Sequence, residues 1–317
     1  MKPALSLCAA AALTLGSALA LAQETKVAIA ISGWTGFAPL TLAKEAGLFK
    51  KQGLDVTIKK IPQKDRHLAI ASGDVQCAAT TVETWVAWNA AGVTTTQIFQ
   101  LDKSYGADGL VVKPGIAKIA DLKGKTVAAS APGTSPYFGL VWMLKKNGLS
   151  IKDVKVVNLE PQAAAAAFVA GNADLDAGMT YEPYLSTVRA KPEAGKIIAT
   201  TLDYPMVMDT FGCAPKFLAE NPKVAKAIAD AYFDAVEMIK TDPKKSFEIM
   251  GADVKQTGEA FEGSQKYLRW QDRAANQKFF SGEHAAFTKE AADLLLEAGI
   301  IKQIPDLTKL ADTQFIK

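Results

Sequence analysis

The chain contains an internal repeat, in which one order of short motifs occurs twice at an offset of about 98–100 residues. In the first copy, a β-type run at 54–56 precedes Ile-Pro-Gln, Ala-Ser-Gly-Asp-Val and a Thr pair. In the second copy, a run at 154–156 precedes Glu-Pro-Gln, Val-Ala-Gly-Asn-Ala and Thr-Tyr. The repeat predicts two similar α/β lobes of about a hundred residues each.

Strand and helix patterns alternate through the first half of the chain, which favours α/β architecture with largely parallel sheets. We expect strands at 26–31, 54–58 and 76–79, and helices at 39–45, 67–71 and 82–91. From about residue 215 only helices are expected, at 223–240, 243–250, 256–267 and 284–298, and they should add no strand. Ligands collect at the carboxyl ends of strands in such sheets, so both lobes should face one cleft.

The N-terminus has the pattern of a cleaved secretory signal peptide. Lys2 is followed by a largely apolar run at 4–19 and by the small-residue site Ala20-Leu21-Ala22. An uncleaved membrane anchor is the alternative, but the run is richer in Ala than in Leu or Ile. We therefore expect cleavage after Ala22 and a periplasmic mature protein.

Two cysteines, Cys77 and Cys213, follow the expected cleavage site, and both lie in apolar, strand-like surroundings. We expect each to be a buried free thiol. A disulfide between them is the open alternative, since a sequence does not show whether two Cα atoms approach within about 7 Å. The chain has no Cys-x-x-Cys, which argues against thioredoxin-like and zinc-ribbon folds.

Composition and motifs exclude several functions. The 36 Lys and Arg residues against 33 Asp and Glu give a net charge of +3, too small for a nucleic-acid-binding surface. There are two histidines and no His-Glu-x-x-His, Gly-x-Ser-x-Gly, Gly-x-Gly-x-x-Gly or phosphate-loop motif. We therefore predict a protein that is not an enzyme and uses neither a cofactor nor a metal.

Strand-to-helix loops carry polar and aromatic groups suited to binding a small molecule. Ser135 precedes Pro136, so the helix that starts there should offer free backbone N–H groups to an anion. Structural alternatives remain open: a capping box for Thr80 and Glu83, a helix-dipole role for Glu182, and a turn role for Asp108.

Four motifs carry a resemblance to a known family. They are Leu-Ala-Lys-Glu-Ala-Gly-Leu-Phe-Lys-Lys-Gln-Gly-Leu-Asp-Val at 42–56, Ala-Ser-Gly-Asp-Val at 71–75, Ala-Asp-Leu-Lys-Gly-Lys-Thr-Val-Ala at 120–128, and Tyr-Glu-Pro at 181–183. The chain resembles periplasmic substrate-binding proteins of ABC importers in the nitrate/sulfonate/taurine group, which are relatives of the thiamine-pyrimidine binding proteins. The resemblance implies a type II, two-lobe "Venus-flytrap" fold with C-terminal helices.

This fold implies a division of the chain into lobes. We expect a signal peptide at 1–22, the first part of lobe 1 at 23–112, lobe 2 at 113–208, and the lobe 1 return strand with the C-terminal helices at 209–317. The chain should cross between the lobes near Val112 and near Asp209.

The resemblance also implies a ligand site. The candidate ligand-binding residues, taken from the matched loops and nearby acids, are Trp34, Thr35, Phe37, Thr80, Thr81, Trp85, Asp108, Thr134, Ser135, Tyr137, Tyr181, Glu182 and Asp209. These loops contain no arginine, and we expect Lys64 and Arg66 to flank the cleft, which disfavours an inorganic anion such as nitrate. A small organic solute containing nitrogen or sulfur fits better, with its anionic group on the helix that starts at Ser135.

The implied partners are that solute and, indirectly, a membrane permease with its ATPase; the binding protein itself should be a monomer. A periplasmic or pyrimidine-synthase-like enzyme on the same fold is the alternative function. The synthase relatives use a Cys-rich site, which this chain lacks.

Overall fold

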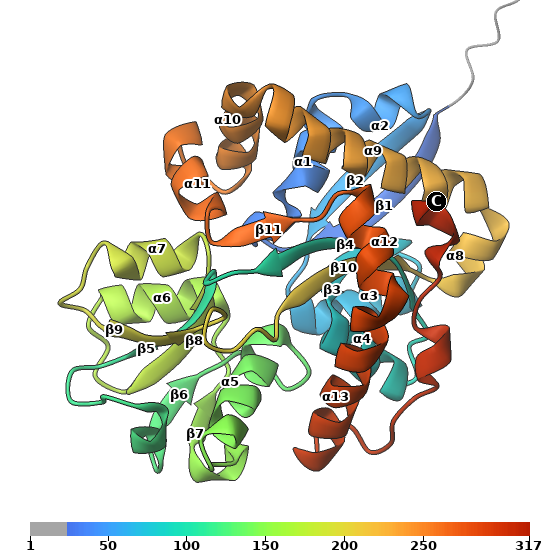
Figure 1. Cartoon of the computed structure of the whole chain (residues 1–317). Coiled ribbons are helices and arrows are strands. Elements are labelled where there is room, and N and C mark those ends of the chain that lie inside the picture. Colours follow the sequence, from blue (N-terminus) through green and yellow to red (C-terminus); the bar gives the residue numbers. More distant parts are fainter. Residues whose placement is uncertain (1–23) are drawn as a thin grey trace, which may run out of the picture.

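The computed structural model describes residues 24–317 and contains two mixed β-sheets with helices packed around them (Figure 1). The first sheet has the strand order β11-β4-β10-β3-β1-β2, and the second has the order β7-β6-β8-β5-β9. The expected signal peptide at 1–22 lies outside the described residues. The two-lobe α/β fold expected from the sequence is confirmed.

The first sheet draws its strands from distant parts of the chain. They are β1 (Thr25–Ile31), β2 (Leu54–Lys60), β3 (Cys77–Thr81), β4 (Thr96–Ser104), β10 (Met208–Cys213) and β11 (Leu268–Trp270). The helices between its early strands are α1 (Ala38–Glu45), α2 (Leu48–Lys51), α3 (Arg66–Ala71) and α4 (Val82–Ala90). In β2, buried Leu54 and Val56 alternate with exposed Asp55 and Thr57, as expected of a strand with one face on the core.

The second sheet comes from one continuous segment. Its strands are β5 (Asp108–Val112), β6 (Thr126–Ala128), β7 (Lys155–Val157), β8 (Ala177–Tyr181) and β9 (Lys196–Thr200). Its helices are α5 (Ser135–Lys146), α6 (Pro161–Val169) and α7 (Tyr184–Arg189).

One internal strand in each sheet runs against both of its neighbours, and the edge strand β11 is also antiparallel to β4. Strand β10 lies antiparallel between β3 and β4, and β5 lies antiparallel between β8 and β9. Both strands enter their sheet directly from the other lobe, without the crossover helix that parallel pairing requires. The expectation of largely parallel sheets is therefore wrong, and both sheets are mixed.

The chain changes sheet at two short segments that lie beside each other. The first follows Ser104 and the second follows Thr200, and the Ser104 hydroxyl is 2.6 Å from the Thr201 hydroxyl. The Gly106 N–H also donates to Thr201 Oγ1, at 2.8 Å. Because β5 belongs to the second sheet, the first change of sheet comes before Asp108, earlier than the crossing expected near Val112.

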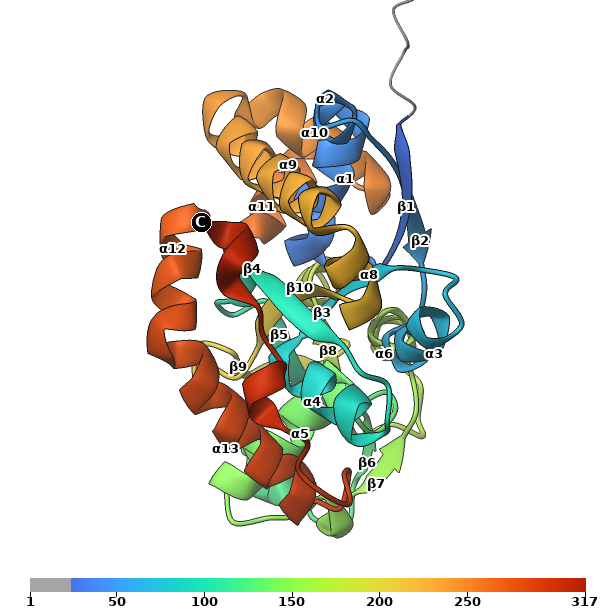
Figure 2. The same cartoon turned by 90° about the vertical axis from the view of Figure 1, so that its right-hand side faces the viewer.

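The C-terminal segment is mostly helical, as expected, but it adds one strand. Its helices are α8 (Pro215–Glu220), α9 (Pro222–Thr241), α10 (Pro243–Asp253), α11 (Gly258–Gln265), α12 (Arg273–Lys278) and α13 (His284–Glu297). The unexpected strand is β11, which pairs with the edge of β4 and is too short to show a periodic pattern. Helix α13 packs against α4 on one side of the molecule (Figure 2). Within residues 24–317, no helix combines the length and apolar character needed to cross a membrane.

A disulfide joins Cys77 in β3 to Cys213 in β10. The two residues are direct partners in the antiparallel register, with Cα atoms 3.9 Å apart, and both are fully buried. The expectation of free thiols is wrong for both cysteines, and the alternative of a disulfide holds. The bond ties the strand that returns from the second lobe to the centre of the first sheet.

We predict that replacing both cysteines (Cys77→Ala with Cys213→Ala) lowers the free energy of unfolding by about 2–4 kcal/mol, because the bond restricts the unfolded chain across a separation of 136 residues. Denaturant titration of wild type and variant measures this loss. Thiol labelling of the unfolded, unreduced wild type is the control, and free thiol at these positions would contradict the assignment.

Candidate functional site

A cavity lies where the two sheets face each other. Its free volume is about 20 Å³, room for one water-sized molecule. Both lobes contribute to its wall, which is lined by Ser32, Trp34, Phe37, Gln63, Arg66, Thr81, Asp108, Ser135, Tyr181, Val207 and Asp209. Most of these residues lie at strand ends or in the loops that follow them, the place where ligands collect in α/β sheets.

The structure brings seven of the thirteen candidate residues into this wall: Trp34, Phe37, Thr81, Asp108, Ser135, Tyr181 and Asp209. It does not place the other six there: Thr35, Thr80, Trp85, Thr134, Tyr137 and Glu182. That the seven contact a ligand stays a prediction.

Three of the six residues outside the wall have structural roles. Trp85 is fully buried in an apolar cluster and donates its indole N–H to Thr210 Oγ1 at 2.7 Å. The Thr134 hydroxyl donates to the carbonyl of Ala131 at 2.7 Å. Tyr137 packs against an apolar cluster that joins the second lobe to α4 and α13.

The two remaining threonines lie just behind the wall. Thr80 is fully buried and accepts a hydrogen bond from the Gln63 amide at 2.8 Å. Thr35 is also fully buried, and its backbone N–H donates across the lobes to the carbonyl of Glu182 at 3.3 Å. Both contribute to the shape of the site through their neighbours.

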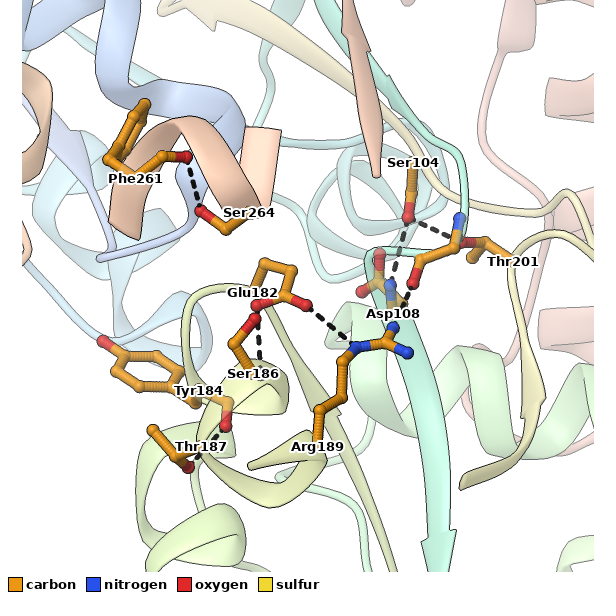
Figure 3. A network of polar contacts seen from close by, with 11 residues as sticks. Ser104, Asp108, Glu182, Tyr184, Ser186, Thr187, Arg189, Thr201, Phe261 and Ser264 are labelled. Carbon is orange, nitrogen blue, oxygen red and sulfur yellow. Dashed lines mark hydrogen bonds and ion pairs between the residues drawn. The ribbon is translucent and has the colours of Figure 1, made fainter. Parts of the chain in front are cut away.

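Glu182 belongs to a polar network beside the crossings (Figure 3). Its carboxylate accepts from the Ser186 N–H at 3.1 Å and from Arg189 Nε at 3.3 Å. Arg189 also donates to the carbonyl of Gly106 at 2.9 Å and lies over the ring of Tyr267, 4.4 Å from its centroid. Because both oxygens of Glu182 have partners here, the structural alternative describes this residue better than ligand contact.

Arg66 lines the cavity, so the expectation that it only flanks the cleft is wrong. Its side chain is buried and donates to two backbone carbonyls, from Nε to Ile61 at 2.9 Å and from Nη1 to Ala79 at 2.6 Å. Burial lowers its pKa to about 10, so the guanidinium stays charged at neutral pH. The site therefore contains a fixed positive charge that sequence reasoning missed.

Gln63 is another of the four lining residues that were not among the candidates; the remaining two are Ser32 and Val207. It begins the turn before α3 and lies in the Ile-Pro-Gln motif of the internal repeat. This motif could have identified Gln63 from the sequence, because it marks a strand-to-helix loop, and the other candidate ligand-binding residues come mostly from loops of that kind.

Four carboxyl groups gather at one side of the cavity: Glu83, Asp102, Asp108 and Asp209, each at most 5% exposed. Asp102 and Asp209 are register partners on neighbouring strands, and Glu83 accepts from the Thr81 hydroxyl. Within the described residues, Glu83 Oε2 and Asp108 Oδ2 have no hydrogen-bond partner. Such buried, unpaired oxygens are costly unless a partner reaches them.

The environment of these carboxyl groups raises their pKa values. Burial raises the pKa of Glu83 to about 8 and that of Asp108 to about 7. Burial and the neighbouring carboxylates also raise the pKa values of Asp102 and Asp209 well above their ordinary range. A cation among these groups would favour their charged forms.

Aromatic rings from both lobes frame the site. Trp34 and Tyr181 meet edge to face, with ring centroids 5.3 Å apart. The Trp34 indole N–H lies 3.3 Å from both oxygens of Asp102, which fixes the ring plane. Among residues 24–317 no cluster of three or more His, Cys, Asp or Glu side chains could hold a metal ion.

We predict that the empty protein loses stability as pH rises from about 5 to 8. The pKa of Glu83 is about 8 in the folded state, against an ordinary 4.5, so the folded state binds more protons in this window. The stabilisation that protonated Glu83 contributes to the folded state is complete below about pH 4.5 and disappears as pH rises through about 8. Thermal melting should show a shallower pH dependence in Glu83→Gln.

The exposed Glu262→Gln variant is the control for this measurement. It should melt with the same pH dependence as wild type. Parallel curves for wild type and Glu83→Gln would remove Glu83 as the origin of the effect.

The chain is similar in sequence to proteins of a known family. A model of the family described as "NMT1/THI5 like" matches residues 34–246, a span that contains every lining residue except Ser32. The taurine-binding periplasmic protein of Escherichia coli (strain K12) is 29% identical over 228 residues, which cover 70% of this chain and 69% of that protein.

Solved structures share the fold. The alkanesulfonate-binding protein of Xanthomonas axonopodis pv. citri, bound to MOPS, superposes with a TM-score of 0.78 at 18% identity, covering 92% of this chain and 99% of the other. A desulfurization enzyme superposes with a TM-score of 0.66 at 14% identity, covering 92% and 97%. One fold thus serves both a binding protein and an enzyme.

Proposed function

Because the chain belongs to the NMT1/THI5-like family, we propose that it is an extracytoplasmic solute-binding protein. It captures a small organic solute of the taurine or sulfonate type, or one bearing an amine, and delivers it to an ABC permease and its ATPase. The observation that carries this proposal is the cavity whose wall is divided between two sheets linked by two short crossings. The similarity to a taurine-binding periplasmic protein supports it.

The proposed location is the periplasm, reached through the signal peptide predicted at 1–22. A monomer suffices for the proposed role, because both halves of the cavity wall come from one chain.

Solute entry requires the lobes to separate. A free volume of about 20 Å³ is far below the few hundred Å³ typical of small-molecule sites. Contacts that cross the cavity include the Thr35–Glu182 backbone bond, the Trp34–Tyr181 ring pair and a bond from Ser135 to Gln63. A solute favours the closed form only through contacts that the open form lacks.

The charges around the cavity define two ends for the solute. Arg66 and the backbone N–H of Ser135 suit an anionic group such as a sulfonate. Glu83 and Asp108, with their unpaired oxygens, suit an ammonium group, and each charge-assisted hydrogen bond contributes about 1.5–3 kcal/mol. Trp34 and Tyr181 lie in the same wall and can pack against the body of the solute.

The enzyme alternative is weaker. Within the described residues, the cavity wall contains serine and threonine hydroxyls but neither histidine nor cysteine. Cys77 and Cys213 are joined to each other, and His284 lies against Gln97 and two phenylalanine rings. We therefore propose binding without chemistry, so that a solute incubated with the protein is recovered unchanged.

We predict that calorimetric titration with taurine and with short alkanesulfonates detects saturable binding to one site. Small-angle scattering should show that the empty protein in solution samples a more open form and that solute makes it more compact. Identical scattering profiles with and without a bound solute would argue against closure of the lobes. Product accumulating beyond one equivalent would favour the enzyme.

We predict that Asp108→Asn weakens binding of an amine-bearing solute at least about tenfold, which is roughly 1.4 kcal/mol, because the amide keeps the shape but loses the charge. Calorimetry at pH 8, above the pKa of about 7, gives the largest contrast. The empty variant should melt no lower than wild type, because the amide avoids the cost of a buried charge at this pH.

Glu182→Gln is the matched comparison. It should leave affinity within about twofold and lower stability by about 1–3 kcal/mol, because Arg189 loses its charged partner. Equal losses of affinity in both variants would contradict the assignment of Glu182 to the network beside the crossings.

A further inference from the structure

Gln63 joins the two lobes across the cavity. Its amide nitrogen donates to Thr80 Oγ1 at 2.8 Å and to Thr84 Oγ1 at 2.9 Å, both in the first lobe. Its amide oxygen accepts from the backbone N–H of Ser135, at 3.2 Å, at the start of α5 in the second lobe. Gln63 itself lines the cavity.

The orientation of this amide follows from its partners. A backbone N–H can only donate, so the oxygen of Gln63 must face Ser135. The NH₂ group then faces Thr80 and Thr84, whose hydroxyls can accept. The hydrogen-bond partners alone therefore fix which end of the Gln63 amide faces the second lobe.

The first turn of α5 has no other side-chain acceptor among the described residues. The Thr134 hydroxyl, at the N-cap, donates to Ala131 and does not cap the helix. Pro136 has no N–H, so the free donors of the first turn are the N–H groups of Ser135 and Tyr137, and of these two residues only Ser135 lines the cavity. Gln63 thus occupies the N–H group that suits the anionic end of a solute.

A second group in the wall favours an anion near this point. Arg66, three residues after Gln63, is 1% exposed, and within the described residues its Nη2 has no hydrogen-bond partner, unlike Nε and Nη1. Its charge would attract an anionic group but gives a neutral amide oxygen little advantage.

We propose that the Gln63 amide oxygen competes with the anionic end of the solute for the Ser135 N–H, an inference that rests on the proposed function. Its amide holds the empty lobes together and releases the Ser135 N–H when the solute enters. Hydrogen bonds to charged acceptors are roughly twice as strong as neutral ones, so a sulfonate oxygen displaces the amide far better than a neutral oxygen does. Gln63 thereby selects solutes with an anionic end over solutes of the same shape whose corresponding end is uncharged.

The size of the effect follows from the fraction of molecules in which the bond is formed. Apparent affinity falls by the fraction of protein competent to bind, and one neutral hydrogen bond shifts that fraction about two- to tenfold. Removing the amide should therefore strengthen binding of an anionic solute by about two- to tenfold.

The first experiment uses no solute. In empty Gln63→Ala, the Ser135 amide should exchange its hydrogen faster than in wild type, and small-angle scattering should show a larger radius of gyration. The exposed Gln52→Ala is the matched control and should behave as wild type. Unaltered exchange at Ser135 in Gln63→Ala would overturn the bond between the lobes.

The second experiment uses calorimetry to compare taurine with 2-aminoethanesulfonamide, which keeps the ammonium group but carries an uncharged sulfonamide in place of the sulfonate. Gln63→Ala should bind taurine about two- to tenfold more tightly and discriminate less against the analogue. Gln63→Glu should bind taurine at least about tenfold more weakly, because a carboxylate holds the N–H more strongly and repels the sulfonate. Unchanged or weaker taurine binding in Gln63→Ala would overturn the competition.

The two experiments separate this inference from the function on which it rests. Faster exchange in Gln63→Ala, in a protein that binds neither probe nor any alkanesulfonate, overturns the proposed function and leaves the bond between the lobes standing. If taurine binds with the same affinity to wild type and to the Gln63 variants, the competition is overturned and the proposed function still stands.

Discussion

The position of β10 between β3 and β4 is the constraint on which the rest of the molecule depends. This strand returns from the second lobe and pairs with both neighbours, so Asp209 lies beside Asp102 on one side and beside Thr81 on the other. The same pairing aligns Cys213 with Cys77 and creates the second crossing. A shift by one residue would turn Asp209 to the other face of the sheet and misalign the cysteines.

The cavity combines groups that are costly to bury. Four carboxyl groups and one guanidinium lie in or near its wall, and the carboxyl groups respond with raised pKa values. Arg66 is satisfied in part by two backbone carbonyls, whereas Glu83 and Asp108 each keep an unpaired oxygen. This arrangement limits the charge buried in the empty site and leaves the unpaired oxygens of Glu83 and Asp108 free to bind a charged solute.

Local patterns predicted most of the elements, because β1, β2, α1 and α4 show complete periodic or capping signals in the sequence. The antiparallel direction of β5 and β10 was not predictable in this way, since direction depends on which lobe the chain arrives from. The disulfide depends on a register between residues 136 positions apart, which no local pattern encodes.

The candidate site was predictable to a similar extent. Loops at strand ends located Trp34, Ser135 and Tyr181 correctly in the wall. Arg66 was missed because its partners are backbone carbonyls that only the folded chain supplies. Conversely, Glu182 resembled a ligand group in sequence, but its partner Arg189 lies seven residues further along, on the far end of α7.

The insertion of β10 also orders events during synthesis. As the chain emerges from its N-terminus, β4 appears long before either strand that will flank it, because β10 and β11 both follow the whole second lobe. Its apolar residues Ile98, Phe99 and Leu101 and both of its hydrogen-bonding edges stay unpaired until then. The second lobe, whose strands are contiguous, can fold at once, so the lobe that comes first in the sequence is the one completed last.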